Sequence, residues 1–425
     1  MTASERFAAY RRLAESNKAY VPPFSFGECR MGCSRDMLLE CWQQASDATK
    51  LNGGMSIYVH VPFCSERRCS FCMYSSSTAY DNAVLEQYRD YISNEFNSWK
   101  MMFSPPIRNF YVGGGTPSVY SASQLLDLLS PFKQFEVDPH GERTCEMSPT
   151  TATESHIMAI AKCGFNRISL GIQSFDPHVI RAVNRKYSDR LHVTRLCSCA
   201  RQLSFVDINL DFMLGLPNIN EDNLREAVVV ARECGALSAS FYYWRQTNVS
   251  RERLEWEFMV VCDEMNKCGW KLVSGTKDTE HHLFFSPKRR MDTLRFVTSS
   301  NCVDNERVIG LGMYAHGFRP SVSYSCDAED SYRIWCMSQD LQLKMAAANI
   351  LYHHNNVVDK QKFANSFGIT FSDCFRDELS ILRELKMIEE SEAEFRLVGR
   401  DNVDMIAAQK FFWDEYYLKR YYGVG

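Results

Sequence analysis

Three cysteines, Cys64, Cys69 and Cys72, lie within nine residues of one another in the stretch YVHVPFCSERRCSFCMY. Thiolates that close in sequence can converge on one metal centre. Three protein ligands, in place of four, leave one coordination position open for chemistry. A closed structural zinc site needs a fourth ligand, and His60 is the candidate nearby. His60 lies in the alternating run IYVHV, which favours a strand residue over a ligand.

Other cysteines of the chain carry weaker signals. Cys29 and Cys33 have a Cys-x3-Cys spacing, but no second pair accompanies them, so ordinary thiols are favoured there. The alternative to any metal site is a set of unrelated buried thiols. Seventeen cysteines is an odd number, and the charged, amphipathic start MTASERFAAYRRLAESNKAY is no export signal. The sequence therefore predicts reduced thiols and a cytoplasmic protein.

The cysteine stretch resembles the cluster loop of the radical SAM superfamily. The preceding YVHVPFC is similar to the oxygen-independent coproporphyrinogen III oxidases and their relatives, which include heme chaperones and class C radical SAM methyltransferases. The resemblance implies that Cys64, Cys69 and Cys72 bind three irons of a 4Fe-4S cluster, whose fourth iron chelates S-adenosylmethionine. The chain departs from the family's Cys-x3-Cys-x2-Cys spacing by one extra residue after Cys64. One more loop residue changes the entropy of closure little.

Composition sets outer limits on the function. The 425 residues, of which 45% are hydrophobic, suffice for one large domain and a small one. No run of eighteen apolar residues occurs, so we expect no membrane partner. The formal net charge is -4 and no long Lys/Arg run appears, so we expect no nucleic-acid partner either.

Short apolar strands alternate with amphipathic helices from Ser56 to about Tyr243, which is typical of βα units on a parallel sheet. The strand candidates are SIYVHV, NFYVGG, RTCEMS, RISLGIQ, DINLDFML and SASFYY. Six strands are too few for a closed eight-stranded barrel. With the resemblance, they predict an α/β fold, an open six-unit (β/α) partial TIM barrel with its chemistry at the C-terminal ends of the strands.

The remaining chain is less regular. After Trp244 the alternation is lost, apart from a strand candidate at GWKLVSG and the glycine-rich VIGLGMYAHGF. From about Asp330, helices followed by a hairpin at MIEESEAEFRLVG predict a winged-helix-like module. The predicted domains are an N-terminal arm over 1–50, the barrel with its late extension over 51–325, and a C-terminal winged-helix-like lid over 326–425.

Distinctive polar residues and glycines fall at the predicted strand ends. Three consecutive glycines, 113–115, let a backbone approach a ligand that any Cβ would obstruct, although a tight turn explains them equally. The carboxylate of Glu146 can accept hydrogen bonds from ribose hydroxyls or an ammonium. Each residue alone could be structural. The resemblance implies cofactor-binding roles for Tyr58, Phe71, Gly114, Gly115, Thr116, Glu146, Gln173, Arg185, Asp211, Trp244 and His316.

The resemblance also implies the activity. An electron from a flavodoxin- or ferredoxin-type donor reaches the cluster and cleaves S-adenosylmethionine, and the resulting 5'-deoxyadenosyl radical takes hydrogen from a small-molecule substrate. After its third cysteine the chain reads Cys72-Met73-Tyr74, where the oxidases carry a Gly-Cys pair. Trp244 stands where the oxidases have a small residue. We therefore expect transfer of a methyl or methylene carbon to an aromatic or unsaturated substrate, with one or two molecules of S-adenosylmethionine bound.

Three alternatives stay open. The first is oxidative decarboxylation of coproporphyrinogen III. The second is a heme chaperone, although its usual His-Asn-x-x-Tyr-Trp segment would fall where this chain has FVTSSNCVDNER. The third is a generic zinc-binding protein.

Overall fold

The computed structural model describes residues 2–16, 25–45, 55–65, 68–103, 107–244, 249–274, 283–287, 307–354 and 356–423. The chain divides into two compact units. The barrel unit comprises Met55–Phe296 and Gly310–Ala315, and the terminal unit comprises Met1–Gly54, Val297–Ile309 and His316–Gly425. The three domain boundaries predicted from the sequence stay a prediction.

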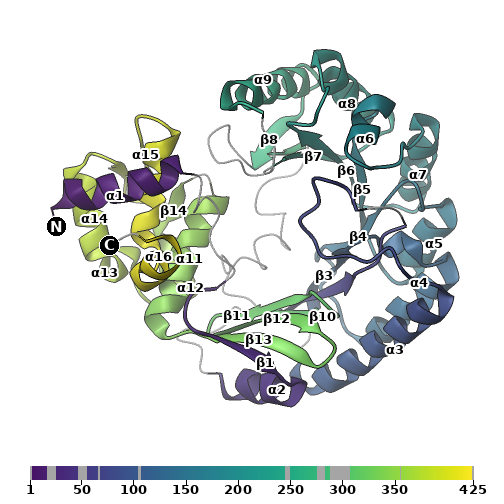
Figure 1. The fold of residues 1–425 in the computed structure, drawn as a ribbon, viewed down its shortest axis with the longest axis horizontal. Coiled ribbons are helices and arrows are strands. Elements are labelled where there is room, and N and C mark those ends of the chain that lie inside the picture. Colours follow the sequence, from purple (N-terminus) through teal and green to yellow (C-terminus); the bar gives the residue numbers. More distant parts are fainter. Residues whose placement is uncertain are drawn as a thin grey trace. The chain divides into compact units, whose positions relative to one another are not determined.

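Six neighbouring parallel strands form the centre of the barrel unit (Figure 1). In order across the sheet they are β2 (Met55–Val61), β3 (Ile107–Gly114), β4 (Arg143–Met147), β5 (Arg167–Gln173), β6 (Asp207–Leu214) and β7 (Ser238–Tyr243). Val59 lies opposite Val112, and Leu170 opposite Leu210. These strands are buried along nearly their whole length, as expected for parallel strands covered on both faces. All six predicted strands are confirmed.

Helices cover the outer face of these strands (Figure 1). They are α3 (Asn82–Trp99), α4 (Ala122–Leu129), α5 (Glu154–Lys162), α6 (Pro177–Ala182), α7 (Arg190–Gln202), α8 (Glu221–Glu233) and α9 (Arg251–Lys267). Side chains of Asp81, Ser121 and Asn220 cap α3, α4 and α8 by accepting hydrogen bonds from backbone amides of the first turn. The open partial TIM barrel is therefore confirmed.

Two antiparallel strands extend the sheet beyond β7. They are β9 (Leu283–Ser286), which pairs with β7, and β8 (Lys271–Ser274), which pairs with β9. The prediction of a strand at GWKLVSG is confirmed by β8, whereas β9 and α9 were not predicted.

The terminal unit contains an antiparallel meander that the sequence analysis did not predict. Its order is β1 (Cys29–Cys33), β13 (Ser331–Cys336), β12 (Val322–Ala328), β11 (His316–Arg319) and β10 (Arg307–Leu311), the last two residues of β10 belonging to the barrel unit. Helix α2 (Arg35–Gln44) lies against β12 and β13 and buries Leu38 and Trp42. Residues 17–24 and 46–50 of the predicted N-terminal arm lie outside the described residues.

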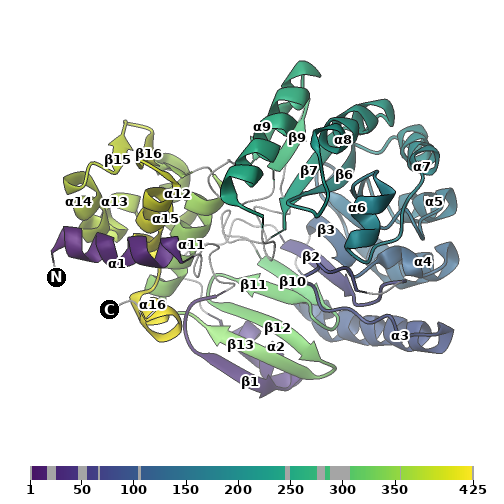
Figure 2. The ribbon, with the colours of Figure 1, turned by 45° about the horizontal axis from the view of Figure 1, so that its top comes forward.

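Short helices and a small sheet make up the rest of the terminal unit. They are α1 (Ala3–Glu15), α11 (Gln339–His353), β14 (Val357–Asp359), α12 (Lys360–Phe367), α13 (Phe371–Cys374), α14 (Arg376–Glu384), β15 (Ile388–Glu390), β16 (Glu394–Leu397), α15 (Asn402–Gln409) and α16 (Glu415–Tyr422). The small sheet has the order β14-β16-β15, and α12 to α14 lie in the chain between β14 and the hairpin of β15 and β16, which is the predicted winged-helix-like arrangement. Helix α1 lies along α15, and Tyr10 packs edge-on against Phe411 at 4.9 Å (Figure 2).

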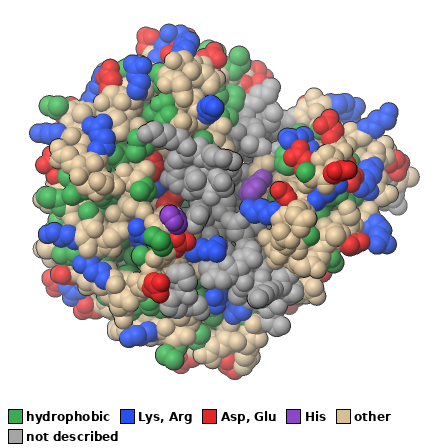
Figure 3. All heavy atoms as spheres, turned by 180° about the vertical axis from the view of Figure 1, so that it is seen from behind, with side chains coloured by type: hydrophobic (Ala, Val, Ile, Leu, Met, Phe, Trp, Pro, Cys, Tyr) green, Lys and Arg blue, Asp and Glu red, His purple; other side chains and the backbone are tan. Residues whose placement is uncertain are grey.

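The described surface is mixed in charge. On the face drawn in Figure 3, Lys and Arg side chains are interspersed with Asp and Glu. Within the described ranges, no helix is both long enough and apolar enough to cross a bilayer.

Candidate functional site

The cysteine loop follows β2 directly and is held by backbone hydrogen bonds. The amide of Cys64 donates to the Ser77 carbonyl at 2.9 Å, and the amide of Cys72 donates to the Cys69 carbonyl at 3.1 Å. Between them, the Ser70 amide donates to the carbonyl of Val183, just beyond α6, at 3.1 Å. The loop is therefore fixed at the carboxyl end of β2, where the barrel fold places chemistry.

The thiols of Cys64, Cys69 and Cys72 are free and partly exposed. Burial raises the pKa of Cys72, and the neighbouring Cys64 and Cys69 thiols raise it further, so the three sulfurs lie close enough to interact. Within the described residues, no three Cys, His, Asp or Glu side chains stand in metal-binding geometry. Residues 66 and 67 of the loop lie outside that part of the chain. The ligand assignment stays a prediction.

The glycines after β3 pack tightly against the start of the cysteine loop. Gly115 donates its amide to the Val61 carbonyl at 2.7 Å, and a Cβ on Gly115 would lie 2.5 Å from the Phe63 carbonyl oxygen. Gly114 has φ +106°, and a Cβ there would lie 2.6 Å from Nε2 of His60. Both residues must be glycine because the protein itself fills the Cβ positions. A bound ligand and a tight turn were the two reasons expected for these glycines, and packing against the protein's own atoms was not foreseen.

Two polar side chains approach the sulfurs. The Thr116 hydroxyl lies 3.7 Å from the Cys64 sulfur. The Arg185 guanidinium donates to the Gly171 carbonyl and lies 3.6 Å from the Cys69 sulfur. A guanidinium beside a thiol favours the thiolate, which is the form that binds metal. Arg185 thus joins the cysteine loop to the end of β5.

Gln173 ends β5 in an unusual conformation. Its φ is +72°, in the left-handed region, and the pairing of β5 with β6 shifts in register between Gly171 and Gln173. Such a conformation costs about 1–3 kcal/mol in a non-glycine residue and is commonest at functional sites. Gln173 and Arg185, which donates to Gly171, thus lie at the same strand end, and their cofactor-binding roles stay a prediction.

Two carboxylates face the interior at half-buried positions. Glu146 accepts hydrogen bonds from the Tyr111 hydroxyl and the Gly114 amide. Burial raises the pKa of Glu146 to about 7, and Asp211 adds to the rise. Asp211 accepts from the Ser169 hydroxyl and the Asn209 amide, both at 2.7 Å, and burial raises its pKa as well.

The other predicted residues are placed as follows. The Tyr58 hydroxyl hydrogen-bonds with Nδ1 of His60 at 2.8 Å, inside β2, which confirms His60 as a strand residue. Phe71 lies half-buried in the cysteine loop. Trp244 follows β7, and its buried indole N–H has no hydrogen-bond partner among the described residues. His316 begins β11 in the terminal unit, so its cofactor role stays a prediction.

The late glycine-rich segment contacts β2 through residues that the sequence analysis did not name. Gly312 has φ +101°, and a Cβ there would lie 2.8 Å from the His60 carbonyl oxygen. The ring of Tyr314 lies 6.0 Å from that of His60 in an edge-on arrangement. Tyr58, Tyr111, His60 and Tyr314 therefore line part of the barrel unit with aromatic surface.

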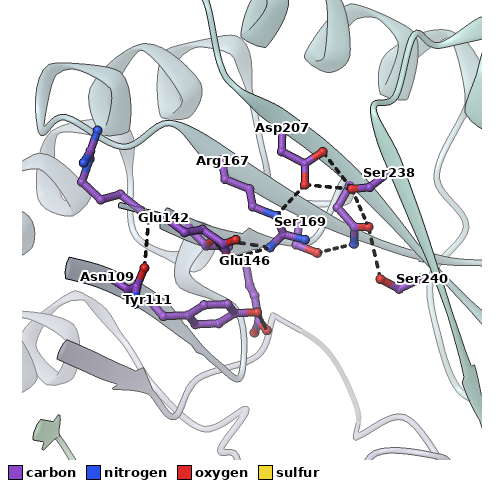
Figure 4. Close-up of polar contacts among 12 residues, drawn as sticks. Asn109, Tyr111, Glu142, Glu146, Arg167, Ser169, Asp207, Ser238 and Ser240 are labelled. Atoms are coloured by element: carbon purple, nitrogen blue, oxygen red, sulfur yellow. Dashed lines mark hydrogen bonds and ion pairs between the residues drawn. The ribbon is translucent and has the colours of Figure 1, made fainter. Parts of the chain in front are cut away.

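A buried ionic network occupies the opposite end of the same strands (Figure 4). Arg167 pairs with Asp207 at 2.8 Å and with Glu142 at 3.7 Å, and the Ser238 hydroxyl donates to Asp207. Burial alone would lower the pKa of Arg167, but the two carboxylates hold it above its ordinary value. These residues lie at the amino ends of β4 to β7, so they stabilise the barrel away from the cysteine loop. The signal in the sequence for this network is the charged residue at the start of β5 and of β6, Arg167 and Asp207.

Comparison with known proteins agrees with this geometry. Residues 58–230 match the family model described as the radical SAM superfamily. The chain is 31% identical over 241 residues to the oxygen-independent coproporphyrinogen III oxidase of Pseudomonas aeruginosa, covering 55% of this chain and 51% of that protein. It is 27% identical over 201 residues to the heme chaperone HemW of Haemophilus influenzae, covering 46% and 51%. The chain thus spans about half the length of these curated relatives.

A solved structure is similar over nearly its full length. The coproporphyrinogen III oxidase of Escherichia coli matches with a TM-score of 0.74 at 18% identity, covering 95% of this chain and 98% of that one. At this identity the likeness establishes the fold. The matched model and the cysteine loop at the strand ends identify residues 58–230 as a radical SAM domain, in a chain that is similar to the coproporphyrinogen III oxidases and their relatives.

Proposed function

We propose that this protein is a radical SAM enzyme that holds a 4Fe-4S cluster on Cys64, Cys69 and Cys72. The donor set fits the group, because three free thiols lie on one loop at the carboxyl end of β2, and three protein ligands leave one coordination position open. These thiols would hold the cluster, which together with bound S-adenosylmethionine would provide radical chemistry for taking hydrogen from a substrate. A flavodoxin- or ferredoxin-type protein supplies the electron, in the cytoplasm.

The chain's own residues bind and orient the cofactor in this proposal. Glu146 and Asp211 offer carboxylate oxygens for the ammonium or the ribose hydroxyls of S-adenosylmethionine. Arg185 offers a guanidinium for its carboxylate, with which it can pair in a bidentate manner. Gln173, in its left-handed conformation, directs an amide toward the same strand end. The tyrosines and His60 exclude water from the site.

We further propose that the enzyme transfers a methyl or methylene carbon to a flat, unsaturated substrate. The observation that carries this is Trp244, whose buried indole N–H lacks a partner in the described part of the chain. Buried donors are nearly always satisfied, so a bound substrate with an acceptor group would complete this one. The indole face suits an aromatic or conjugated substrate.

The decisive test uses S-adenosylmethionine labelled in its methyl group. The reduced enzyme is incubated with extracts of the producing organism and, separately, with coproporphyrinogen III. We expect label in a product from the extract and slow or no formation of protoporphyrinogen. Trp244→Ala should lower label transfer at least tenfold, about the cost of one hydrogen bond and its stacking surface, whereas Trp256→Ala, on helix α9, should not. Rapid turnover of coproporphyrinogen III with no labelled product would contradict the proposal.

The second candidate is decarboxylation of coproporphyrinogen III, and the observation in its favour is the 31% identity to an oxidase of that kind. A heme chaperone is the third, favoured by the similarity to HemW. The segment 296–307, where the heme-binding motif of the chaperones would fall, lies outside the described residues apart from Arg307. The labelled-substrate experiment separates all three, because a chaperone forms neither product.

Binding of S-adenosylmethionine should strengthen as pH rises. Burial raises the pKa of Glu146 to about 7, so the carboxyl is mostly protonated below that pH. It must then lose its proton before it can accept the ligand's hydrogen bonds as a carboxylate. The ionised fraction increases about tenfold from pH 6 to pH 8, and calorimetric affinity should follow it. In the Glu146→Gln variant, the affinity for S-adenosylmethionine should be weaker by about 1–3 kcal/mol. The variant should also lose the pH dependence that comes from ionisation of Glu146. The control is Glu154→Gln, at an exposed position, which should keep the pH dependence of the parent protein. If Glu146→Gln shows the same pH slope as the parent protein, the assignment of Glu146 is refuted.

A further inference from the structure

A second group of thiols lies in the terminal unit, remote in sequence from the cysteine loop. Cys336 ends β13, Cys33 ends β1, and Cys41 lies in α2. In the pairing of β1 with β13, Arg30 lies opposite Ile334 and Cys33 opposite Tyr332, so Arg30 is near the end of β13, where Cys336 lies. The sequence analysis set Cys29 and Cys33 aside because no partner cysteines were near in sequence. The fold supplies partners from about 300 residues away.

Cys336 has the features of a reactive thiol. Among the sixteen cysteines in the described ranges it alone is exposed, so a small molecule can reach it. The Arg30 guanidinium donates to its sulfur at 3.1 Å. This contact is shorter than the 3.6 Å between Arg185 and Cys69. A cation at hydrogen-bonding distance favours the thiolate, and the thiolate is the nucleophile in thiol chemistry.

Cys41 lies in α2, the helix that packs on β12 and on β13, whose last residue is Cys336. It lies three residues after the buried Leu38, at the edge of the helix face that packs on the sheet. Trp42, 2% exposed, packs edge-on against Tyr324 at 5.9 Å, and Arg319 donates to the Trp42 carbonyl at 2.6 Å. Burial raises the pKa of Cys41, and the adjacent Cys336 raises it further. Cys41 is therefore the less accessible thiol of the pair.

We propose that Cys336 is a modification site that reacts with low-molecular-weight disulfides, and that Cys41 resolves the product into an intramolecular disulfide. In the first step the Cys336 thiolate attacks one sulfur of the small disulfide. That S–S bond breaks, a mixed disulfide forms on Cys336, and one small thiolate leaves with the electron pair and takes up a proton. In the second step Cys41, as its thiolate, attacks the Cys336 sulfur and displaces the second small thiol. Two protein thiols are oxidised and one small disulfide is reduced to two thiols.

This inference is independent of the proposed cofactor chemistry, since all its residues lie in the terminal unit. The new disulfide would join α2 to the last residue of β13, two residues before Ser338 caps α11. Oxidised glutathione is a suitable probe because it is the small disulfide of many cells.

The test treats the anaerobically reconstituted full-length protein with oxidised glutathione, blocks the remaining thiols and maps the peptides by mass spectrometry. The same treatment of a variant with Cys64, Cys69 and Cys72 replaced by alanine removes the contribution of those thiols. We expect a peptide linking Cys41 to Cys336 as the main product in both. In the Cys41→Ser variant, the reaction should stop after one glutathionyl group has been added to Cys336. The Cys336→Ser variant should give neither this mixed disulfide nor the Cys41–Cys336 link.

Arg30 provides the second readout. Arg30→Gln should slow modification of Cys336 by about fivefold to tenfold, because the cation that favours the thiolate is gone. Arg12→Gln, on α1, is the matched control and should leave the rate unchanged. The buried thiols of Cys197 and Cys234 should stay unmodified. Unmodified Cys336 alongside other oxidised cysteines would overturn the proposal, and a Cys33–Cys336 link would overturn the assignment of Cys41.

Discussion

Simultaneous replacement of Cys64, Cys69 and Cys72 by alanine is expected to reduce bound iron from about four atoms per chain to none after anaerobic reconstitution. The reason is that thiolate ligands hold such clusters outright, and no neighbouring described side chain forms an alternative metal site. Iron and sulfide analysis, with the visible absorbance of the cluster, measures the change. Formation of 5'-deoxyadenosine from S-adenosylmethionine and a reductant should disappear with the iron.

A matched triple variant controls for the loss of three thiols. Cys163, Cys199 and Cys268 are half-buried cysteines of the same unit and lie away from the loop, so their replacement by serine should leave the iron content unchanged. Retention of a full cluster by the alanine variant would refute the ligand assignment. Binding of a single zinc in place of iron and sulfide would favour the zinc-binding alternative.

Arg167→Met is expected to destabilise the barrel unit by about 3–5 kcal/mol, because it leaves the carboxylates of Asp207 and Glu142 buried without their cation. Asp207 is fully buried and Glu142 is 7% exposed, so neither can turn to water. The free energy of unfolding from urea titration measures the loss. Asp207→Asn in the Arg167→Met background should restore part of it, since one uncompensated charge is removed.

Arg143→Met is the control for the Arg167 variant. Arg143 also stands at the start of a strand, but it donates to the backbone carbonyls of Gly164 and Asp138 and pairs with no buried carboxylate. Its replacement should cost about 1 kcal/mol per hydrogen bond lost. Equal destabilisation by both substitutions would show that side-chain packing, and not the buried charges, determines the stability of this end of the barrel.

The sequence was sufficient to locate the barrel strands and the cysteine loop. A strand such as DINLDFML is buried on both faces and therefore stands out as a continuous apolar run. Helix α9 was missed for the opposite reason. Its buried positions are Glu257, Val261 and Met265, and the glutamate, which accepts a hydrogen bond from the Gly215 amide at 2.7 Å, interrupts the apolar stripe.

Long-range pairings were beyond the sequence analysis. The strand β1 has the sequence CRMGC, with no strand-like alternation, and exists because it pairs with β13, Cys29 lying opposite Trp335. The reasons for Gly114 and Gly115 were hidden in the same way, because the atoms that exclude a Cβ belong to His60 and Phe63, more than fifty residues earlier. Such contacts become visible only when both partners are in place.

The chain passes four times between the two units, after residues 54, 296, 309 and 315. Neither unit is therefore one continuous segment that ribosomal synthesis could complete before the other begins. The six residues Gly310–Ala315 enter the barrel unit only after 13 residues of the terminal unit, Val297–Ile309, have been made. Folding of the whole chain must therefore wait for contacts between residues that are far apart in the sequence. Such contacts form slowly, and the partly folded intermediates that precede them can aggregate. A single crossover between homologous genes cannot exchange either unit whole, because each unit is made of more than one segment of the chain.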